Sequence, residues 1–317
     1  MKVTVIICTN APERYLDIVG LIESLISQTY TNIEIIIIID QIIELYNRFI
    51  SDSFFSDNNK IIIGLSDYKG LSNARNTGVK FSSGDIIAFI DDDAIAKQDW
   101  VCNLLKNYSD PSIIGVGGMM KPLWVSGFAR WIPEEFYWTI GCSYKSQCLS
   151  KCNVRSNFGS NMSFRREIFD VVGFFDPNYG LIDNNLRTGE ETEFSIRALN
   201  RIIGSRIIFD PDCIVFHRIY QFRKSPIYIL KRCYAYGVAI AKIEKYKIIN
   251  DDSIKPVELT FINYLLKSSF QERLTSIVNM ERICENISKI FFLIIFTITV
   301  GIGFLFGKLI CRIFSIR

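Results

Sequence analysis

Four short apolar runs rich in β-branched residues divide the first ninety or so residues, and they constrain the fold more than any other feature of the sequence. The runs lack a regular alternation of polar and apolar side chains, as expected for strands buried on both faces of a parallel sheet. The segments between them have helical spacing, so the pattern predicts a βαβαβαβ unit of the nucleotide-binding type. The predicted strands are residues 3–8, 33–39, 61–65 and 86–90, and the predicted helices are residues 15–26, 42–55 and 71–81.

Polar side chains gather where these strands end. Ligands of such sheets bind at the carboxyl ends of the strands. The ends here carry Cys8-Thr9-Asn10, Asp40 and Asp91-Asp92-Asp93, and residues 69–75 lead into a helix nearby. The sequence therefore predicts a ligand site at this edge of the sheet.

The triplet Asp91-Asp92-Asp93 closes an apolar strand. Three carboxylates at one strand end repel one another and would have raised pKa values without a cation. Mg²⁺ or Mn²⁺ is typically held by one or two carboxylates together with ligand phosphates. A metal site is one interpretation, and an ordinary acidic turn that caps a helix near Gln98 is the other.

The remainder of the chain is less regular. Residues 119–158 are rich in aromatic side chains and are interrupted by glycine and proline, which predicts a long loop region. A strand is expected near residues 161–164, a helix over residues 190–200, and strands near Ile207 and Ile214. Residues 226–246 and 256–289 have helical patterns.

Net charge and cysteine content exclude some classes of protein. The net charge of +3 is the small difference between 36 basic and 33 acidic residues, which gives no reason to expect a nucleic-acid partner. Nine cysteines are an odd number and none forms a CxxC pair, so we expect reduced thiols in a cytosolic compartment. Cys142, Cys148 and Cys152 could supply three metal ligands, but no histidine or fourth cysteine lies near them.

The two ends of the chain differ sharply. The first residues carry no export signal, whereas residues 290–306, closed by Gly307, carry no charge and are flanked by Lys289 and Lys308. As a helix this run would measure about 27 Å, close to the thickness of a bilayer core. It predicts a transmembrane helix, with a buried core helix as the alternative. Gly303 and Gly307 have the GxxxG spacing that can pair helices.

A series of motifs resembles the signature of family 2 glycosyltransferases, which have the GT-A fold. The motifs occur in family order over roughly residues 1–220: GLSNARNTG at 70–78, GDIIAFIDDD at 84–93, GSNMSFRR at 159–166, GFFD at 173–176, GEETEF at 189–194 and VFHR at 215–218. The resemblance implies an α/β fold of the Rossmann-like nucleotide-diphospho-sugar transferase type. It places a GT-A domain at residues 1–220, a helical extension at 221–284, and a transmembrane helix with a basic tail at 285–317.

The resemblance also implies a nucleotide-sugar site. Thr9 and Asp40 would meet the uridine, Asn73 and Arg75 would line the nucleotide pocket, and Asp91 and Asp92 would meet the ribose. Asp93, with Asp91, would bind the metal. In the alternative interpretation Asp40 caps a loop and Arg75 pairs with the aspartates.

Three further residues have implied roles. The acidic pair Glu190-Glu191 begins a helix at the place where the family has its catalytic acids, and Glu191 occupies the position of the base, with a longer side chain than the usual aspartate. Two carboxylates at a helix start are also favoured by the helix dipole alone. His217, the single histidine, stands where the family often binds metal or diphosphate, and it could instead be packed in place. Arg218, Arg223 and Arg232 follow it and could offset diphosphate charge.

Residues 130–145, with their aromatic run, are similar to a narrower group of archaeal enzymes that extend dolichyl-phosphate-linked saccharides, including glucosyl-dolichyl phosphate glucuronosyltransferases. That similarity implies an inverting, Mn²⁺- or Mg²⁺-dependent hexosyltransferase in N-glycan assembly. It would use a UDP-sugar donor and a lipid-linked saccharide acceptor at the cell membrane, with its catalytic domain in the cytoplasm. An enzyme of bacterial-type capsule assembly and an inactive, membrane-tethered sugar-binding protein are the alternatives.

Overall fold

The computed structural model describes residues 1–179, 188–244 and 257–314. Three residues of the sequence predictions lie outside these ranges. They are Tyr246, the predicted end of one helix, Pro256, the predicted start of the next, and the basic residue Arg317. The chain divides into two compact units. The first unit comprises Met1–Lys121 and Ser150–His217, and the second comprises Pro122–Leu149 and Arg218–Arg317.

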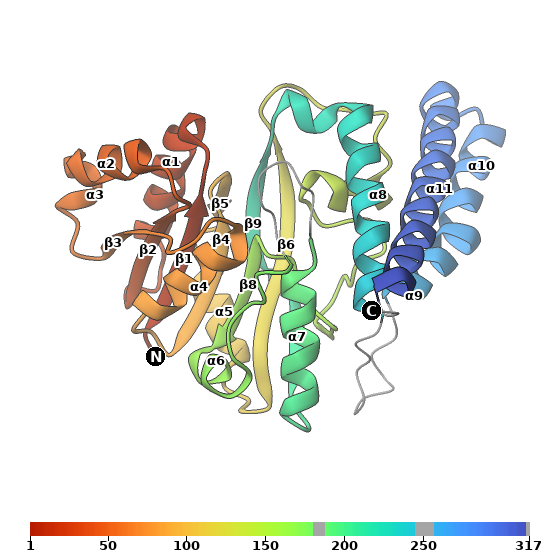
Figure 1. The fold of residues 1–317 in the computed structure, drawn as a ribbon. Helices are drawn as coiled ribbons and strands as arrows, with labels where there is room; N and C mark the ends of the chain where they lie inside the picture. The colour runs from red at the N-terminus through yellow and green to blue at the C-terminus, as the bar shows by residue number, and fades with distance from the viewer. Residues whose placement is uncertain (180–187, 245–256, 315–317) are drawn as a thin grey trace. The chain divides into compact units, whose positions relative to one another are not determined.

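The first unit is built on one mixed sheet (Figure 1). Its strand order is β3-β2-β1-β4-β8-β6-β9-β5, with β7 paired to β9. The first four strands pair in parallel, and β4–β8, β6–β8, β5–β9 and β7–β9 pair antiparallel. The strands are β1 (Val3–Thr9), β2 (Ile33–Ile39), β3 (Ile61–Leu65), β4 (Ile86–Asp91), β5 (Ala94–Ala96), β6 (Ile113–Trp124), β7 (Cys152–Asn153), β8 (Asn161–Arg165) and β9 (Arg206–Ile219).

The predicted βαβαβαβ order of elements is confirmed. Every residue of β2 is buried and β1 is nearly so, as expected, but the edge strand β3 is only partly buried, because no further strand of the described residues covers it. The helices of the first unit are η1 (Pro12–Arg14), α1 (Tyr15–Ile26), α2 (Ile43–Ser51), α3 (Ser53–Ser56), α4 (Leu71–Phe81), α5 (Trp100–Asn107), α6 (Arg166–Val172) and α7 (Glu190–Arg201). Helices α1 and α4 have the predicted limits. The helix predicted over residues 42–55 is divided at Asp52, because the Asp52 side chain accepts a hydrogen bond from the Phe54 amide and starts a new helix.

Two other predictions are corrected by long-range pairing. The strands expected near Ile207 and Ile214 are one continuous strand, β9. Residues 119–124, expected in a loop, continue β6. Both differences arise because a sheet supplies hydrogen-bond partners from distant segments, which local patterns do not reveal.

The prediction that all nine cysteines are reduced is wrong for two of them. Cys148 and Cys152 are disulfide-bonded, and the other seven are free. An odd total excludes complete pairing but not a single bond. Since both sulfurs are used in this way, the group of Cys142, Cys148 and Cys152 cannot supply three metal ligands.

The second unit is helical around an aromatic core. Phe136, Ile140, Ile229, Leu293 and Phe296 are buried in it. Its elements are η2 (Glu134–Ile140), η3 (Gln221–Lys224), α8 (Pro226–Ile243), α9 (Val257–Tyr264), a π-helical turn (Leu265–Ser269), α10 (Phe270–Val278) and α11 (Ile283–Phe314). Among the described residues, α11 is the one helix long and apolar enough to cross a membrane, as the sequence predicted.

Helices α8 and α11 pack closely because glycines form the contact between them. A Cβ built on Gly303 would lie 2.2 Å from the carbonyl oxygen of Tyr234, and one on Gly237 would lie 2.1 Å from that of Val300. A Cβ on Gly307 would lie 2.7 Å from the Cβ of Ala241. The two glycines of the GxxxG spacing therefore pack against α8 of the same chain.

We expect Gly303→Ala to lower the free energy of unfolding of the second unit by about 1–3 kcal/mol, because the added methyl group forces the two backbones apart. Gly301→Ala is the matched control, since a Cβ on Gly301 meets nothing within 4 Å. That change should be neutral or stabilising by up to about 1 kcal/mol through helix propensity. Resistance of the detergent-solubilised variants to trypsin across a temperature range measures the difference. Equal losses in both variants would show that the close contact is absent.

Candidate active site

The acidic triplet is brought to a histidine by a short reversal of the chain. Strand β4 ends at Asp91, and the chain turns through Asp92 and Asp93 into β5. Strand β5 pairs antiparallel with β9, in a register that sets Ala94 opposite His217. His217 Nε2 consequently lies 3.1 Å from Asp93 Oδ1 and 3.7 Å from Asp91 Oδ2.

These three side chains could hold a divalent ion. One ligand atom from each of Asp91, Asp93 and His217 lies within 4.8 Å of the others. The side chains of Asp93 and His217 are 0% and 1% exposed, whereas that of Asp91 is 38% exposed, so the group is fixed on one side and open on the other. Two carboxylates and an imidazole together can ligate a divalent metal ion. Burial opposes ionisation of Asp91, yet the hydrogen bond from His217 holds its pKa below the ordinary value.

Asp92, predicted to meet the ribose, is turned toward the protein. Its carboxylate is hydrogen-bonded and ion-paired to Arg14, and Thr9 also donates a hydrogen bond to it. Burial raises the pKa of Asp92 to about 6, although the nearby Arg14 charge opposes this shift. The second Arg14 nitrogen, Nη2, lies 3.2 Å from Asp93 Oδ2. Arg14 therefore supplies the acidic turn with a fixed positive charge.

Arg14 was not predicted from the sequence. It ends η1, in the connection between β1 and α1, and only its place after the β1 strand end could have marked it. No motif or spacing distinguishes it from other surface arginines.

The predicted uridine contacts lie at the ends of β1 and β2. Thr9 closes β1 and accepts a hydrogen bond at 3.4 Å from the Ala11 amide to Oγ1. The Asp40 amide donates to the Thr9 carbonyl at 2.8 Å, which joins the two strand ends. The Asp40 carboxylate accepts hydrogen bonds at 3.0 Å from Ser66 Oγ and from the Gly70 amide, so it also caps the loop that leads into α4. The Gly70 amide also lies 3.0 Å from the second carboxylate oxygen, Oδ2.

Helix α4 presents the two predicted nucleotide-pocket residues differently. Asn73 is partly exposed, and its Nδ2 donates to the Lys69 carbonyl at 2.8 Å. Arg75 is 3% exposed, and its Nη1 donates to Glu190 Oε1 at 2.7 Å. Burial of Arg75 opposes its charge, but Glu190 and Asp91 raise its pKa above the ordinary value. Glu190, rather than an aspartate of the triplet, is the ion-pair partner of Arg75.

Glu190 and Glu191 begin α7 together but differ in environment. Glu190 is 5% exposed and fixed by Arg75, whereas Glu191 remains partly exposed. Burial, followed by the Glu190 charge, raises the pKa of Glu191 to about 8, with Arg75 opposing the shift. A carboxyl group with a pKa near neutrality can both take up and release a proton under ordinary conditions.

Comparisons with known proteins agree with this geometry. Residues 4–173 match the family described as "Glycosyl transferase family 2". The chain is 30% identical over 312 residues to a glucosyl-dolichyl phosphate glucuronosyltransferase of Haloferax volcanii, covering 98% of this chain and 97% of that protein. It is 26% identical over 280 residues to the glycosyltransferase GlyA of Streptococcus pneumoniae, covering 88% of this chain but 35% of that protein.

Among solved structures, the chain is similar to a mannosyltransferase of Pyrobaculum calidifontis in complex with GDP-mannose and Mn²⁺. The TM-score is 0.61 at 15% identity, over 97% of this chain and 88% of that one. This likeness confirms the predicted GT-A fold.

We expect Asp93→Asn to reduce the Mn²⁺-dependent affinity for UDP by about 100-fold or more. Mutation of a residue that only hydrogen-bonds to a metal ligand lowers metal affinity by about 10–100-fold, so loss of a ligand itself should cost at least as much. Isothermal titration with UDP, with and without Mn²⁺, measures this loss. Asp67→Asn is the matched control, because Asp67 is an exposed aspartate of the same unit whose carboxylate lies 3.1 Å from Lys80 Nζ. If Asp93→Asn keeps the metal-dependent gain in affinity, Asp93 is not a ligand.

Proposed function

Since the chain belongs to glycosyl transferase family 2 and is a hexosyltransferase, we propose that it transfers a sugar from a UDP-sugar to a hydroxyl group of a lipid-linked saccharide. Glucuronic acid is the first sugar to test, because the Haloferax relative is named as a glucuronosyltransferase. The observation that carries the proposal is the position of Glu191 beside the buried Arg75–Glu190 pair, with a pKa raised to about 8.

Each group at the strand ends has a proposed role in holding the donor. Thr9, Asp40 and Asn73 contact the nucleoside, Arg75 is positioned by Glu190 near the nucleotide, and Asp92 is held by Arg14 at the ribose side. Asp91, Asp93 and His217 would hold the divalent ion, which would neutralise charge on the departing diphosphate. Mn²⁺ and Mg²⁺ are the ions to test.

The chemical step requires one proton transfer by the protein. Glu191 accepts the proton of the acceptor hydroxyl as that oxygen forms a bond to the anomeric carbon. The bond from that carbon to the diphosphate oxygen breaks on the opposite side, and the nucleoside diphosphate leaves with the electron pair. A single displacement of this kind inverts the anomeric configuration.

The raised pKa of Glu191 also favours one class of acceptor. A sugar hydroxyl has a pKa far above neutrality and needs a base, whereas a lipid monophosphate is already an anion. A carboxyl group poised near neutrality therefore fits a hydroxyl acceptor, such as the sugar of a dolichyl-phosphate-linked saccharide in N-glycan assembly. An acceptor of capsule assembly would present the same hydroxyl chemistry, and comparison of the two lipid-linked saccharides as substrates distinguishes them.

We assign residues 1–220 to the GT-A domain, 221–284 to a helical extension and 285–317 to a membrane-attached tail. The boundaries follow the motif order in the sequence, while the compact second unit also takes in Pro122–Leu149. The candidate membrane helix α11 supports attachment to the membrane, where a polyprenyl-linked acceptor resides. Cytoplasmic placement of the GT-A domain gives it access to nucleotide sugars.

We expect Glu191→Gln to lower kcat by about 10²–10⁴-fold, because it removes the general base. Donor binding should be unchanged, since the Arg75–Glu190 pair is left intact. Steady-state kinetics with a lipid-linked saccharide and titration with UDP measure the two properties separately. A variant that keeps more than about a tenth of wild-type kcat would remove Glu191 from the role of base.

The pH profile of kcat/KM gives an independent test. The carboxylate form of Glu191 is the reactive form, and its fraction increases with pH up to the raised pKa of about 8. We therefore expect kcat/KM to rise by about tenfold per pH unit on the acid side and to level off above about pH 8. The residual activity of Glu191→Gln should lack this rise, and a wild-type profile without it would contradict the assignment.

A further inference from the structure

Helix α11 has the length of a membrane span, but it is attached to other parts of the second unit along its course. Its uncharged run, residues 290–307, would measure about 27 Å as a helix. A helix that crosses a bilayer alone needs lipid or other apolar helices around this whole run. The neighbours of α11 therefore decide whether it can cross.

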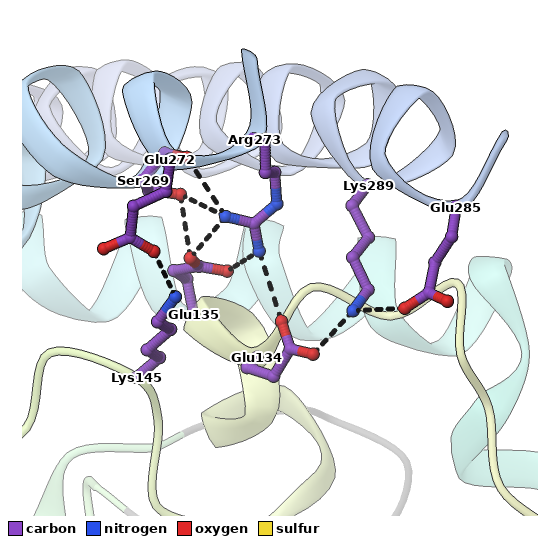
Figure 2. A network of polar contacts seen from close by, with 8 residues as sticks. All are labelled: Glu134, Glu135, Lys145, Ser269, Glu272, Arg273, Glu285 and Lys289. Carbon is purple, nitrogen blue, oxygen red and sulfur yellow. Dashed lines mark hydrogen bonds and ion pairs between the residues drawn. The ribbon is translucent and has the colours of Figure 1, made fainter. Parts of the chain in front are cut away.

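The first attachment is a network of charges at the start of the run (Figure 2). Lys289 donates to Glu134 Oε1 at 2.6 Å and lies 3.0 Å from Glu285. Glu134 is also 3.2 Å from Arg273 of α10. These contacts join α11, α10 and η2 at one place.

The centre of this network is almost completely buried. Glu135 is 0% exposed, and its two carboxylate oxygens accept hydrogen bonds at 2.9 and 2.8 Å from the two terminal nitrogens of Arg273. Ser269 donates a further hydrogen bond to Glu135 at 2.8 Å. Separating α10 from η2 would leave the Glu135 and Arg273 charges unpaired in the interior, which is strongly unfavourable.

The second attachment is the glycine contact with α8. It also fixes which residues of α8 lie level with which residues of α11. Tyr234 meets Gly303, Gly237 meets Val300 and the backbone of Phe304, and Ala241 meets Gly307. From Tyr234 to Ala241 of α8 the partner on α11 moves from Gly303 to Gly307, so the two helices run in parallel. At the end of the contact, Lys308 of α11 forms an ion pair with Glu244.

This register sets charged residues of α8 beside the middle of the apolar run. Extended by one to two turns toward the N-terminus, the contacts of Tyr234 with Gly303 and of Gly237 with Val300 bring residues 231 and 232 level with about residues 294–301 of the apolar run. Lys231 is exposed. If α11 crossed the bilayer in this arrangement, both cations, Lys231 and Arg232, would lie near the bilayer centre, where charged side chains are strongly disfavoured.

The uncharged part of helix α8 is also too short to cross a bilayer beside α11. Its uncharged stretch, residues 233–241, comes between Arg232 and Lys242. Nine residues of helix span about 13 Å, less than half of a bilayer core of about 30 Å. The pair α8–α11 therefore does not fit across a membrane.

We infer that α11 lies along the surface of a lipid bilayer, with one face on α8 and the other in the interfacial region, and does not cross it. The outward face is a continuous apolar stripe at helical spacing, and the occupant is the lipid itself. Its residues are 45–69% exposed: Phe291, Ile294, Ile298, Ile302, Leu305 and Leu309. A helix packed on protein on one side and lipid on the other needs no polar face, which accounts for its composition.

This inference concerns membrane topology and goes beyond the transfer reaction. Two native thiols on α11 can test it, because Cys284 and Cys311 flank the apolar run, Cys284 being exposed and Cys311 partly exposed. In sealed membrane vesicles that contain the full chain, a membrane-impermeant maleimide should label both thiols from the same side. Cys284→Ser and Cys311→Ser identify the two labelled peptides by mass spectrometry.

A second reporter guards against low reactivity of Cys311. Arg312→Cys, made in the Cys311→Ser background, places a thiol just beyond the apolar run, where the native side chain is charged and exposed. If Cys284 and this thiol react equally before and after detergent permeabilisation, α11 lies on one side. If the C-terminal thiol reacts only after permeabilisation while Cys284 reacts before it, α11 crosses and the inference is wrong. The activity assay is independent of this outcome, so the transfer proposal stands or fails separately.

Discussion

The concentration of negative charge at the end of β4 is the constraint around which the first unit is arranged. Asp92 and Asp93 are buried directly after an apolar strand, and Asp91 lies at its last position. Buried carboxylates are tolerated only where cations or hydrogen-bond donors face them. Arg14 and His217 meet this need from two distant segments, before α1 and on β9.

The same requirement extends to the second acidic group. Glu190 is buried with Arg75, and this pair holds the start of α7 against α4, 115 residues away in sequence. Burial and the Glu190 charge raise the pKa of the adjacent Glu191, and Arg75 opposes this shift. In the proposed mechanism, the raised pKa suits Glu191 to proton transfer.

The sequence predicted those parts of the structure that depend on local pattern. The parallel strands, α1 and α4 follow from runs of apolar residues and helical spacing, and the acidic triplet follows from its place after a strand. The role of Arg14, the short return strand β5 and the continuity of β9 were not predicted, because each depends on a partner far away in sequence. The disulfide-bonded Cys148 and Cys152 were not predicted, because the odd cysteine count, the absence of CxxC pairs and the expected cytosolic compartment all favoured free thiols.

Length and hydropathy identified α11 as a candidate membrane helix. Its close contact with α8 at Gly237 and Gly303 was not predicted, because no property of residues 290–307 alone contains that information.

The proposed transfer reaction has a direct test of its own. The most direct measurement is the anomeric configuration, by NMR, of the product formed from an α-linked UDP-sugar and a lipid-linked saccharide, with Mn²⁺ and then with excess chelator. A β-linked product that forms only with metal is predicted, and an α-linked product or unchanged turnover in chelator would contradict the account.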